Sequence, residues 1–393
     1  MKKIGFFPFI LCSLLLRGQD NLPKITKDFP GGNIYVENIT LDTIWLKPDL
    51  RDTNGDWFYW FFKVSGVSGR TITFQFIRNH VFTTFGPAYS LNNSDNWSWL
   101  GENSVGDNRF TFCFDETDTI AYFSMAMPYT EKDYYNFLEK LKNRELWKAD
   151  TLCYTRQSRI VEELYIKPQN HEAPIKVLIT ARHHACEMMA NYVLEGIIES
   201  ILDESTLQHL REKVEFRIIP FVDKDGVENG DQGKNRIPRD HNRDYNNTAI
   251  YSATMEIRKK IPQWADTKLK IALDLHCPWI SGKYNEWIYI VGSSNPENER
   301  QQKKFSKLLE KHSHSELKFE HANFLPFGEA WNKPENFDQG MSFTRWALSI
   351  DGIKLSTTLE FPYANVSGTH VSKENAWEFG KSIAFAIQEF LQL

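Results

Sequence analysis

After about residue 130, hydrophobic residues alternate between short continuous runs and longer stretches with helical spacing. Continuous apolar, β-branched runs at Pro174–Thr180, Val214–Pro220 and Leu269–Leu275 predict buried strands. A late run, Ser356–Pro362, predicts another strand that ends near Glu360. Helical spacing predicts helices over residues 132–141, 188–202, 298–312 and 373–391. Strands alternating with helices predict a mixed α/β sheet with helices on both faces.

The earlier part of the chain, from Asn21 to about Met125, has β-rich runs instead of helical spacing. Turn residues separate the predicted strands, which cover residues 33–41, 57–64, 71–77 and 109–114. The run Trp57–Phe62 is aromatic throughout, too apolar for a strand with one face in water. We expect it to pack on both sides in the core of an all-β sandwich, with a sugar-binding platform as the alternative.

The N-terminus has the pattern of a secretory signal. Lys2 and Lys3 precede the apolar stretch Ile4–Leu16, which is too short to span a membrane. The following Arg17-Gly18-Gln19 is a poor cleavage site, and an unprocessed apolar tail is the alternative. We therefore expect a signal peptide at residues 1–19, a β-sandwich domain at 20–126 and a catalytic domain at 127–393, in a periplasmic or secreted protein.

Composition agrees with a folded enzyme. The 393 residues are 41% hydrophobic and 14% aromatic, which is enough for two cores. The net charge of −5 gives no broad basic field, so nucleic acid is not an expected partner. We expect no stable membrane insertion, and the sequence does not determine the oligomeric state.

Three candidate metal ligands lie next to predicted strand ends. His184 and Glu187 form an H-x-x-E between the strand 174–180 and the helix 188–202, and His276 follows the strand 269–275. In open α/β sheets ligands collect at the carboxyl ends of strands. A catalytic zinc keeps three protein ligands and one open position. The three residues therefore predict a catalytic zinc site, whereas H-x-x-E alone would be a common surface pair.

Other residues could complete a reaction centre. Glu360 ends the late strand and could be the base that activates a zinc-bound water. Residues 225–233 form a Gly/Asp/Asn-rich stretch that we expect to be a loop. Arginine forks match carboxylates, so Arg236, Arg239 and Arg243 after this loop could bind an anionic group. A solvated basic loop is the alternative interpretation.

These motifs, in this order, resemble the zinc carboxypeptidases, and most closely the cytosolic-carboxypeptidase-like branch. The zinc loop A-R-Q-H-P-G-E of that branch appears here as A-R-H-H-A-C-E at residues 181–187, and D-L-H at 274–276 matches the second histidine. The motif D-x-N-R appears at residues 240–243, D-K-D-G-V at 223–227 matches N-P-D-G-V, and the glutamate of T-x-E matches Glu360. The resemblance covers nearly the whole chain after residue 20.

The resemblance implies a role for each matched residue. His184, Glu187 and His276 would bind one zinc ion, and Glu360 would act as general base and then general acid. Asp240 would fix the tautomer of His184. Asn242 and Arg243 would hold the substrate's terminal carboxylate, and Arg236, or Arg239 as its rival, would polarise the scissile carbonyl. We expect His183 and His241 to be loop or second-layer histidines and not metal ligands.

The resemblance also implies a specificity pocket. In this family the pocket is set partly by a side chain fifteen positions before the catalytic glutamate, which here is Arg345. A guanidinium at this place would favour C-terminal Glu or Asp and repel Lys or Arg. An arginine paired with a neighbouring helix is the alternative.

Two departures from the family lie beside the predicted ligands. Cys186 replaces a glycine, and Cys277-Pro278 replaces Gly-His. The two cysteines could form a disulfide, but we favour packed thiols. Digestive relatives have a cis bond after the second histidine, so we predict a cis peptide at Pro278.

The sequence therefore predicts a zinc-dependent carboxypeptidase that acts on peptide or protein C-termini. The alternative enzyme is a zinc amidase or isopeptidase acting on cell-wall peptides or acylated amino acids. A non-catalytic binding protein on the same fold is the alternative outside the enzymes, and the intact metal ligands and Glu360 argue against it.

Overall fold

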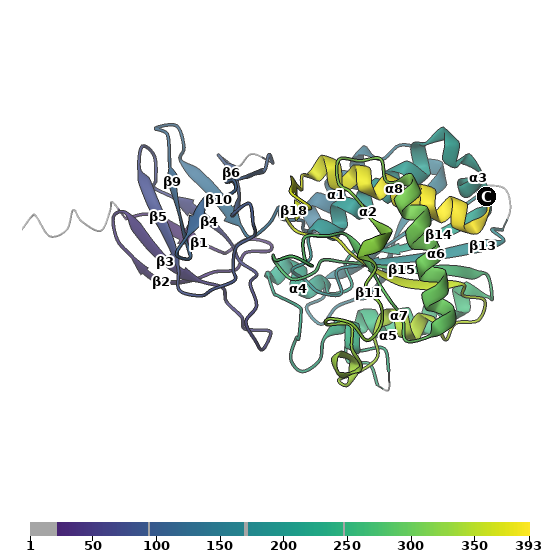
Figure 1. Cartoon of the computed structure of the whole chain (residues 1–393). Coiled ribbons are helices and arrows are strands. Elements are labelled where there is room, and N and C mark those ends of the chain that lie inside the picture. Colours follow the sequence, from purple (N-terminus) through teal and green to yellow (C-terminus); the bar gives the residue numbers. More distant parts are fainter. Residues whose placement is uncertain (1–21, 93–94, 169–171, 247) are drawn as a thin grey trace, which may run out of the picture.

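The structure is a computed structural model that describes residues 22–92, 95–168, 172–246 and 248–393. The predicted signal at residues 1–19 lies outside these ranges. An all-β part is followed by a larger α/β part, and the two lie side by side in Figure 1. No helix within the described ranges is both long and apolar enough to cross a membrane.

Two five-stranded sheets form the N-terminal part. One has the order β1 (Lys24–Thr26), β4 (Phe61–Ser65), β10 (Ile120–Ser124), β6 (Ala88–Leu91) and β7 (Ser98–Trp99). The other has the order β2 (Tyr35–Ile39), β3 (Thr43–Lys47), β5 (Thr71–Phe76), β9 (Arg109–Cys113) and β8 (Val105–Gly106). The ring of Phe62 on β4 contacts Phe74 on β5, so the two sheets share an aromatic core.

The aromatic run at residues 57–62 is buried on both sides, as expected for core, but only its end is a strand. Phe58, Trp60 and Phe62 have no exposed surface, and β4 begins at Phe61. The backbone N–H groups of Phe58 and Tyr59 donate to Gln232 Oε1 at 3.2 and 2.9 Å. The predicted strand is therefore shortened, because these donors bind a side chain of the α/β part.

A mixed seven-stranded sheet organises the α/β part, which confirms the predicted fold class. Its order is β11 (Trp147–Tyr154), β12 (Ile160–Ile166), β14 (Val214–Ile219), β13 (Ile175–Ala181), β15 (Leu269–His276), β17 (Leu355–Glu360) and β16 (Tyr289–Val291). The central strands β14, β13, β15 and β17 are parallel, so their carboxyl ends meet at one edge. A short hairpin pairs β18 (Asn365–Val366) with β19 (Thr369–His370).

Helices cover both faces of this sheet (Figure 1). Val177 and Ile179 of β13 pack in a core with α2 (Met189–Asp203), α6 (Pro296–His312) and α8 (Lys373–Leu391). Leu178 points the other way, toward α5 (Ser252–Ala265) and α7 (Phe343–Ala347). The remaining helices are α1 (Glu131–Lys140), α3 (Gln208–Lys213) and α4 (Lys224–Asn229), with short 3₁₀ turns that include η3 (His241–Arg243) and η5 (Pro334–Phe337).

Helices α2 and α8 approach closely at two glycines. A Cβ atom at Gly196 would lie 1.9 Å from the carbonyl oxygen of Trp377, and one at Gly380 would lie 2.1 Å from that of Val193. No side chain fits at either position without moving a backbone. The glycines therefore set the distance between the two helices.

Two local predictions are corrected. The expected loop 225–233 begins as the helix α4, because Asp223 caps it by accepting from Gly226 N and Gly230 ends it with a left-handed φ of 76°. The cis bond predicted at Pro278 is wrong: the described cis peptide joins Ile237 and Pro238. The prediction for Pro278 came from relatives with a different residue there, and nothing in this chain required it.

Candidate metal centre and substrate pocket

The three predicted metal ligands meet at the carboxyl edge of the central strands. His276 is the last residue of β15, and Glu360, the last residue of β17, is its register partner. His184 and Glu187 lie in the turn between β13 and α2. Arg182 closes this turn, since its guanidinium donates to Ala185 O at 3.0 Å and to Asn191 Oδ1 at 2.8 Å.

The ligand atoms face one another at distances that suit zinc. His184 Nδ1 lies 2.9 Å from Glu187 Oε1 and 3.2 Å from His276 Nδ1, and Glu187 Oε2 lies 2.8 Å from His276 Nδ1. Ligands placed tetrahedrally about 2.0–2.1 Å from zinc would be about 3.3 Å apart. Glu187 Oε2 is buried and has no hydrogen-bond partner. These residues therefore fit a zinc ion, which would satisfy that oxygen.

A carboxylate fixes the outer nitrogen of each histidine. Asp240 Oδ2 lies 3.0 Å from His184 Nε2, which is the contact expected from the sequence. Asp274 Oδ2 lies 2.7 Å from His276 Nε2. Such partners orient metal-binding imidazoles and select the tautomer that presents the other nitrogen to the metal. Both histidines thus present Nδ1 to the same point.

Behind Asp274 the hydrogen bonds continue into the core. Its Oδ1 accepts from Thr180 Oγ1 and lies 2.8 Å from His183 Nδ1, and His183 Nε2 lies 2.7 Å from Tyr245 Oη. His183 is fully buried. His183, Asp274 and His276 also form a cluster of metal-ligating residue types, but both nitrogens of His183 have protein partners. His183 therefore supports the site from behind.

The carboxylates at the centre have opposite pKa shifts. Burial raises the pKa of Glu360, a shift only partly opposed by His276 and Lys234, and its Oε2 has no hydrogen-bond partner. Burial also pushes the pKa of Glu187 upward, but Lys234, His276 and His184 outweigh it and hold that pKa well below its usual value. Glu187 is thus suited to stay ionised as a ligand, and Glu360 to exchange a proton.

Lys234 is a residue of this centre that sequence reasoning missed. Its Nζ lies 2.6 Å from Glu187 Oε1 and donates to Cys277 O at 2.7 Å. Burial alone would lower the pKa of this ammonium group, but the carboxylates of Glu187 and Glu360 raise it. Lys234 therefore carries a fixed positive charge beside the metal ligands.

The structure does not bring Arg236 or Arg239 to the centre. The guanidinium of Arg236 donates to Asp231 at 2.9 Å and Asp223 at 2.6 Å, and it lines a different cavity, with His241. Arg239 pairs with Asp244 at 2.7 Å. These carboxylates already neutralise both arginines, which corrects the expectation that Arg236 faces the scissile carbonyl. His241 stacks on Tyr251, and burial lowers its pKa to about 4.

Cys186 and Cys277 are both free and buried, as favoured from the sequence. Cys186 Sγ lies 3.4 Å from Tyr363 Oη and accepts from Gln232 Nε2 at 3.0 Å. Burial raises the pKa of Cys186 to about 12. Both residues therefore act as small packed thiols.

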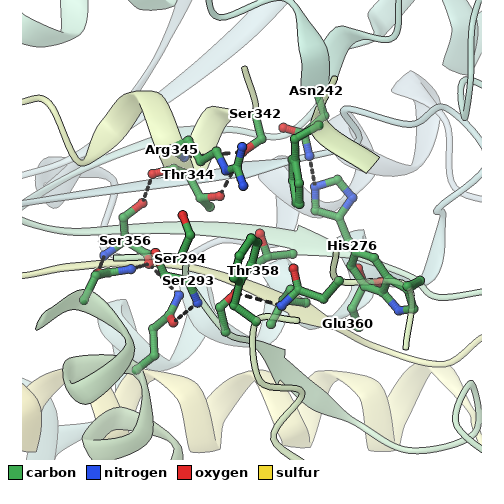
Figure 2. Close-up of a pocket in the computed structure, with 18 of the residues that line it drawn as sticks. Asn242, His276, Ser293, Ser294, Ser342, Thr344, Arg345, Ser356, Thr358 and Glu360 are labelled. Atoms are coloured by element: carbon green, nitrogen blue, oxygen red, sulfur yellow. Dashed lines mark hydrogen bonds between the residues drawn. The ribbon is translucent and has the colours of Figure 1, made fainter. Parts of the chain in front are cut away.

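A pocket leads away from the metal ligands, and Figure 2 shows its lining. Ser356, Thr358 and Glu360 alternate along β17 and face into it. At about 3.3 Å per residue, the pocket extends about 13 Å from Glu360 to Ser356. In the figure His276 and Glu360 lie at one end, and Arg345 and Ser356 at the other. The lining also includes the polar residues Ser293, Ser294, Asn298 and Gln302.

Asn242, Arg243 and Arg345 contribute to the pocket wall. Asn242 is held by donation from Phe343 N to its Oδ1 at 2.9 Å and lies 3.2 Å from His276 Nε2. Arg243 uses Nε to donate to Asn336 O at 2.9 Å. Among the residues that the structure describes, no carboxylate forms an ion pair with Arg243 or Arg345. Burial and then repulsion from Arg243 lower the pKa of Arg345. The pocket thus has two guanidinium groups and is suited to an anionic ligand.

Comparison with known proteins agrees with this geometry. The sequence model of the family described as "Zinc carboxypeptidase" matches residues 134–252. Cytosolic carboxypeptidase 6 of Caenorhabditis elegans is 26% identical over 69% of this chain and 65% of its own length. Cytosolic carboxypeptidase 6 of mouse is 28% identical over 51% of this chain and 39% of its own length. The chain thus spans less than two thirds of these relatives.

The fold has a counterpart among solved structures. A metallo-carboxypeptidase from Burkholderia cenocepacia superposes with a TM-score of 0.75 at 18% sequence identity, over 94% of this chain and 98% of that one. Both the β part and the α/β part are therefore included in the likeness. Zinc is the metal of the matched family, which confirms zinc as the expected cofactor.

Proposed function

This chain carries a zinc carboxypeptidase domain, and we propose that the protein is a zinc-dependent carboxypeptidase that hydrolyses the C-terminal peptide bond of peptides or proteins. One observation carries this proposal. The three ligand atoms and the carboxylate of Glu360 converge at one end of a pocket whose walls contain Arg243 and Arg345. A C-terminal residue placed in this pocket presents its peptide bond to Glu360.

The protein's own groups divide the work of hydrolysis. When bound by His184, Glu187 and His276, zinc would supply Lewis acidity, which makes water more acidic and a carbonyl more electrophilic. Glu360 takes a proton from the attacking water and later gives it to the leaving amine, for which a raised pKa is suited. Lys234, whose ammonium group lies beside the metal ligand Glu187, would supply positive charge at the metal end of the pocket, the role expected of Arg236.

Arg243 and Asn242 would bind the carboxylate that marks a C-terminus. Arg243 keeps guanidinium N–H groups available, because the guanidinium donates to only two acceptors among the described residues, the backbone carbonyls of Asn242 and Asn336. A guanidinium binds a carboxylate by two parallel hydrogen bonds. This contact would restrict the enzyme to chain ends.

Arg345 would select the side chain of the departing residue. It lies in the pocket without an acidic partner among the described residues, and burial with Arg243 nearby lowers its pKa. A carboxylate on the substrate would relieve both effects. We therefore propose a preference for C-terminal Glu or Asp.

The test is a set of peptides that differ only in the last residue, assayed with zinc-loaded protein. Peptides ending in Glu or Asp should have the highest kcat/KM, and Glu360→Gln should retain zinc by metal analysis while losing about 10²–10⁴-fold in kcat. Preference for Leu or Lys ends would contradict the specificity. Hydrolysis of acyl or side-chain amides with no release of C-terminal residues would contradict the carboxypeptidase assignment.

We propose export on the basis of Lys2, Lys3 and the apolar stretch Ile4–Leu16. The protein should occur in the periplasmic or extracellular fraction, with a mature N-terminus near residue 20. Mass spectrometry of the purified protein tests this, and a cytoplasmic protein that begins at Met1 would contradict it.

A further inference from the structure

The ring of Phe337 lies within cation–π distance of both guanidinium groups of the pocket. Its centroid is 3.8 Å from Arg345 Cζ and 5.0 Å from Arg243 Cζ. The three residues come from separate elements: Phe337 ends η5, Arg243 ends η3 and Arg345 lies in α7. The ring therefore forms a bridge that exists only in the folded chain.

The segment that carries Phe337 is fixed to Arg243 and its neighbours. Asn336 O accepts from Arg243 Nε at 2.9 Å, and Tyr245 N donates to Met341 O at 3.2 Å. A Cβ atom at Gly340 would lie 2.0 Å from Arg243 O, so the backbones touch. This docking holds the ring in place against both arginines.

The contact with Phe337 offsets the repulsion between Arg243 and Arg345. The two guanidinium groups lie against one ring and repel each other, so burial and then the charge of Arg243 lower the pKa of Arg345. The face of an aromatic ring is electronegative and attracts a cation that stacks on it. The ring of Phe337 can hold both guanidinium groups near the pocket, where either would otherwise turn toward water.

We propose that Phe337 is a positioning residue for specificity: it holds Arg243 and Arg345 so that together they bind the two carboxylates of a C-terminal acidic residue. This inference rests on the proposed function and deepens it. Arg243 takes the α-carboxylate and Arg345 the side-chain carboxylate. Phe337 touches neither reacting atoms nor metal ligands, so it acts on binding through the arginines.

The test compares two peptides that differ only in ending with Glu or Gln, which have the same shape and differ in charge. Phe337→Leu removes the ring, and the ratio of kcat/KM for Glu over Gln should fall about tenfold. The fall should come from a higher KM for the Glu peptide with kcat nearly unchanged, because this binding is the same in the ground and transition states. Phe337→Tyr keeps a ring and should keep the ratio.

Matched variants separate this inference from the proposed function. Phe327→Leu removes a ring 5.7 Å from Arg345 Cζ and should change the ratio less. An unchanged ratio in Phe337→Leu, or an equal fall in Phe337→Tyr, would overturn the role of the ring. If Arg345→Gln nevertheless abolishes the preference for Glu, the proposed specificity is supported and only the role of Phe337 fails. A wild-type protein that does not prefer Glu over Gln would overturn both.

Discussion

Asp274 joins the metal centre to the protein core. One of its oxygens lies beside His276 Nε2, and the other is shared by His183 and Thr180. The neighbouring histidines hold the pKa of Asp274 far below its usual value against the opposing effect of burial. An ionised Asp274 keeps a proton on His276 Nε2, which leaves Nδ1 free for the metal.

Replacing Asp274 should therefore weaken zinc binding. Asp274→Asn keeps the shape but removes the charge that fixes the tautomer of His276, and the dissociation constant for zinc should rise about 10–100-fold. Competition with a chromogenic chelator measures this without any activity assay. Asp351→Asn changes an exposed aspartate and is the matched control. Equal zinc affinity in Asp274→Asn and wild type would contradict the role given to this carboxylate.

Glu195 makes stability depend on pH. Burial, with Asp133 nearby, raises its pKa from 4.5 to about 7, although Tyr129 donates to it at 2.6 Å and opposes the shift. Between these values the folded protein binds more protons than the unfolded chain, so stability falls as pH rises through this window.

Glu195→Gln should remove this dependence. Its melting temperature should exceed that of wild type at pH 8, where the carboxylate is ionised, and match it near pH 4, where Glu195 is protonated in both states. Scanning calorimetry at the two pH values measures the effect. Glu139→Gln removes an exposed carboxylate from α1 and controls for net charge. If wild type melted at a higher temperature than Glu195→Gln at pH 8, the prediction would be refuted.

Among the elements, the segment between α4 and η3 depends most on distant residues. Asp52 accepts from Gln232 N at 3.1 Å and from Gly233 N at 2.8 Å, and its backbone oxygen accepts from Ile237 N at 2.9 Å. Thr53 Oγ1 donates to Lys234 O. The N-terminal part thus determines where Lys234 lies.

Asp52→Ala should damage both this segment and the metal centre. It leaves two buried N–H groups without their charged acceptor, which should cost about 1.5–3 kcal/mol in the free energy of unfolding measured with urea. Activity should fall as well, since Lys234 loses its support. Asp56→Ala changes an exposed aspartate nearby and should be close to neutral. Full stability and activity in Asp52→Ala would show that the segment between α4 and η3 keeps its conformation without Asp52.

The same contacts explain which elements could be predicted from the sequence. Buried strands such as β13 and β15, and the long α8, were predicted to within a residue or two, because their patterns are local. The zinc ligands followed from fixed spacing at strand ends. Lys234 and Arg236 could not be assigned correctly, because their partners Thr53 and Asp52 lie about 180 positions earlier and reach them only in the fold.

At the scale of the whole molecule, the two parts share an extensive boundary. Trp57 contacts Trp279 with ring centroids 5.0 Å apart, and Phe58 contacts Tyr363 at 5.7 Å. Asn33 Nδ2 donates to Gly230 O at 2.6 Å, and Trp99 Nε1 to Val371 O at 2.6 Å. Neither part could leave the other without exposing aromatic surface and unpaired polar groups.

The two parts should therefore unfold together. Urea denaturation followed by tryptophan fluorescence, by circular dichroism and by activity should give coincident transitions, as for a two-state unit. A chain limited to residues 127–393 should lack this cooperative transition, because Gln232 and Gly233 lose their partners. Two separate transitions in the whole protein would contradict the shared boundary.

The close approach of α2 and α8 at Gly196 and Gly380 couples the packing of these helices to the geometry of the metal centre. Helix α2 begins two residues after Glu187, and Gly196 lies about 10 Å further along it. A methyl group added at Gly380 would act as a wedge against Val193 and push the rigid helix outward. This displacement of α2 would also move Glu187, which is a proposed metal ligand just before the helix. A substitution that inactivates this protein can therefore lie in α8, a helix that contributes no residue to the pocket lining.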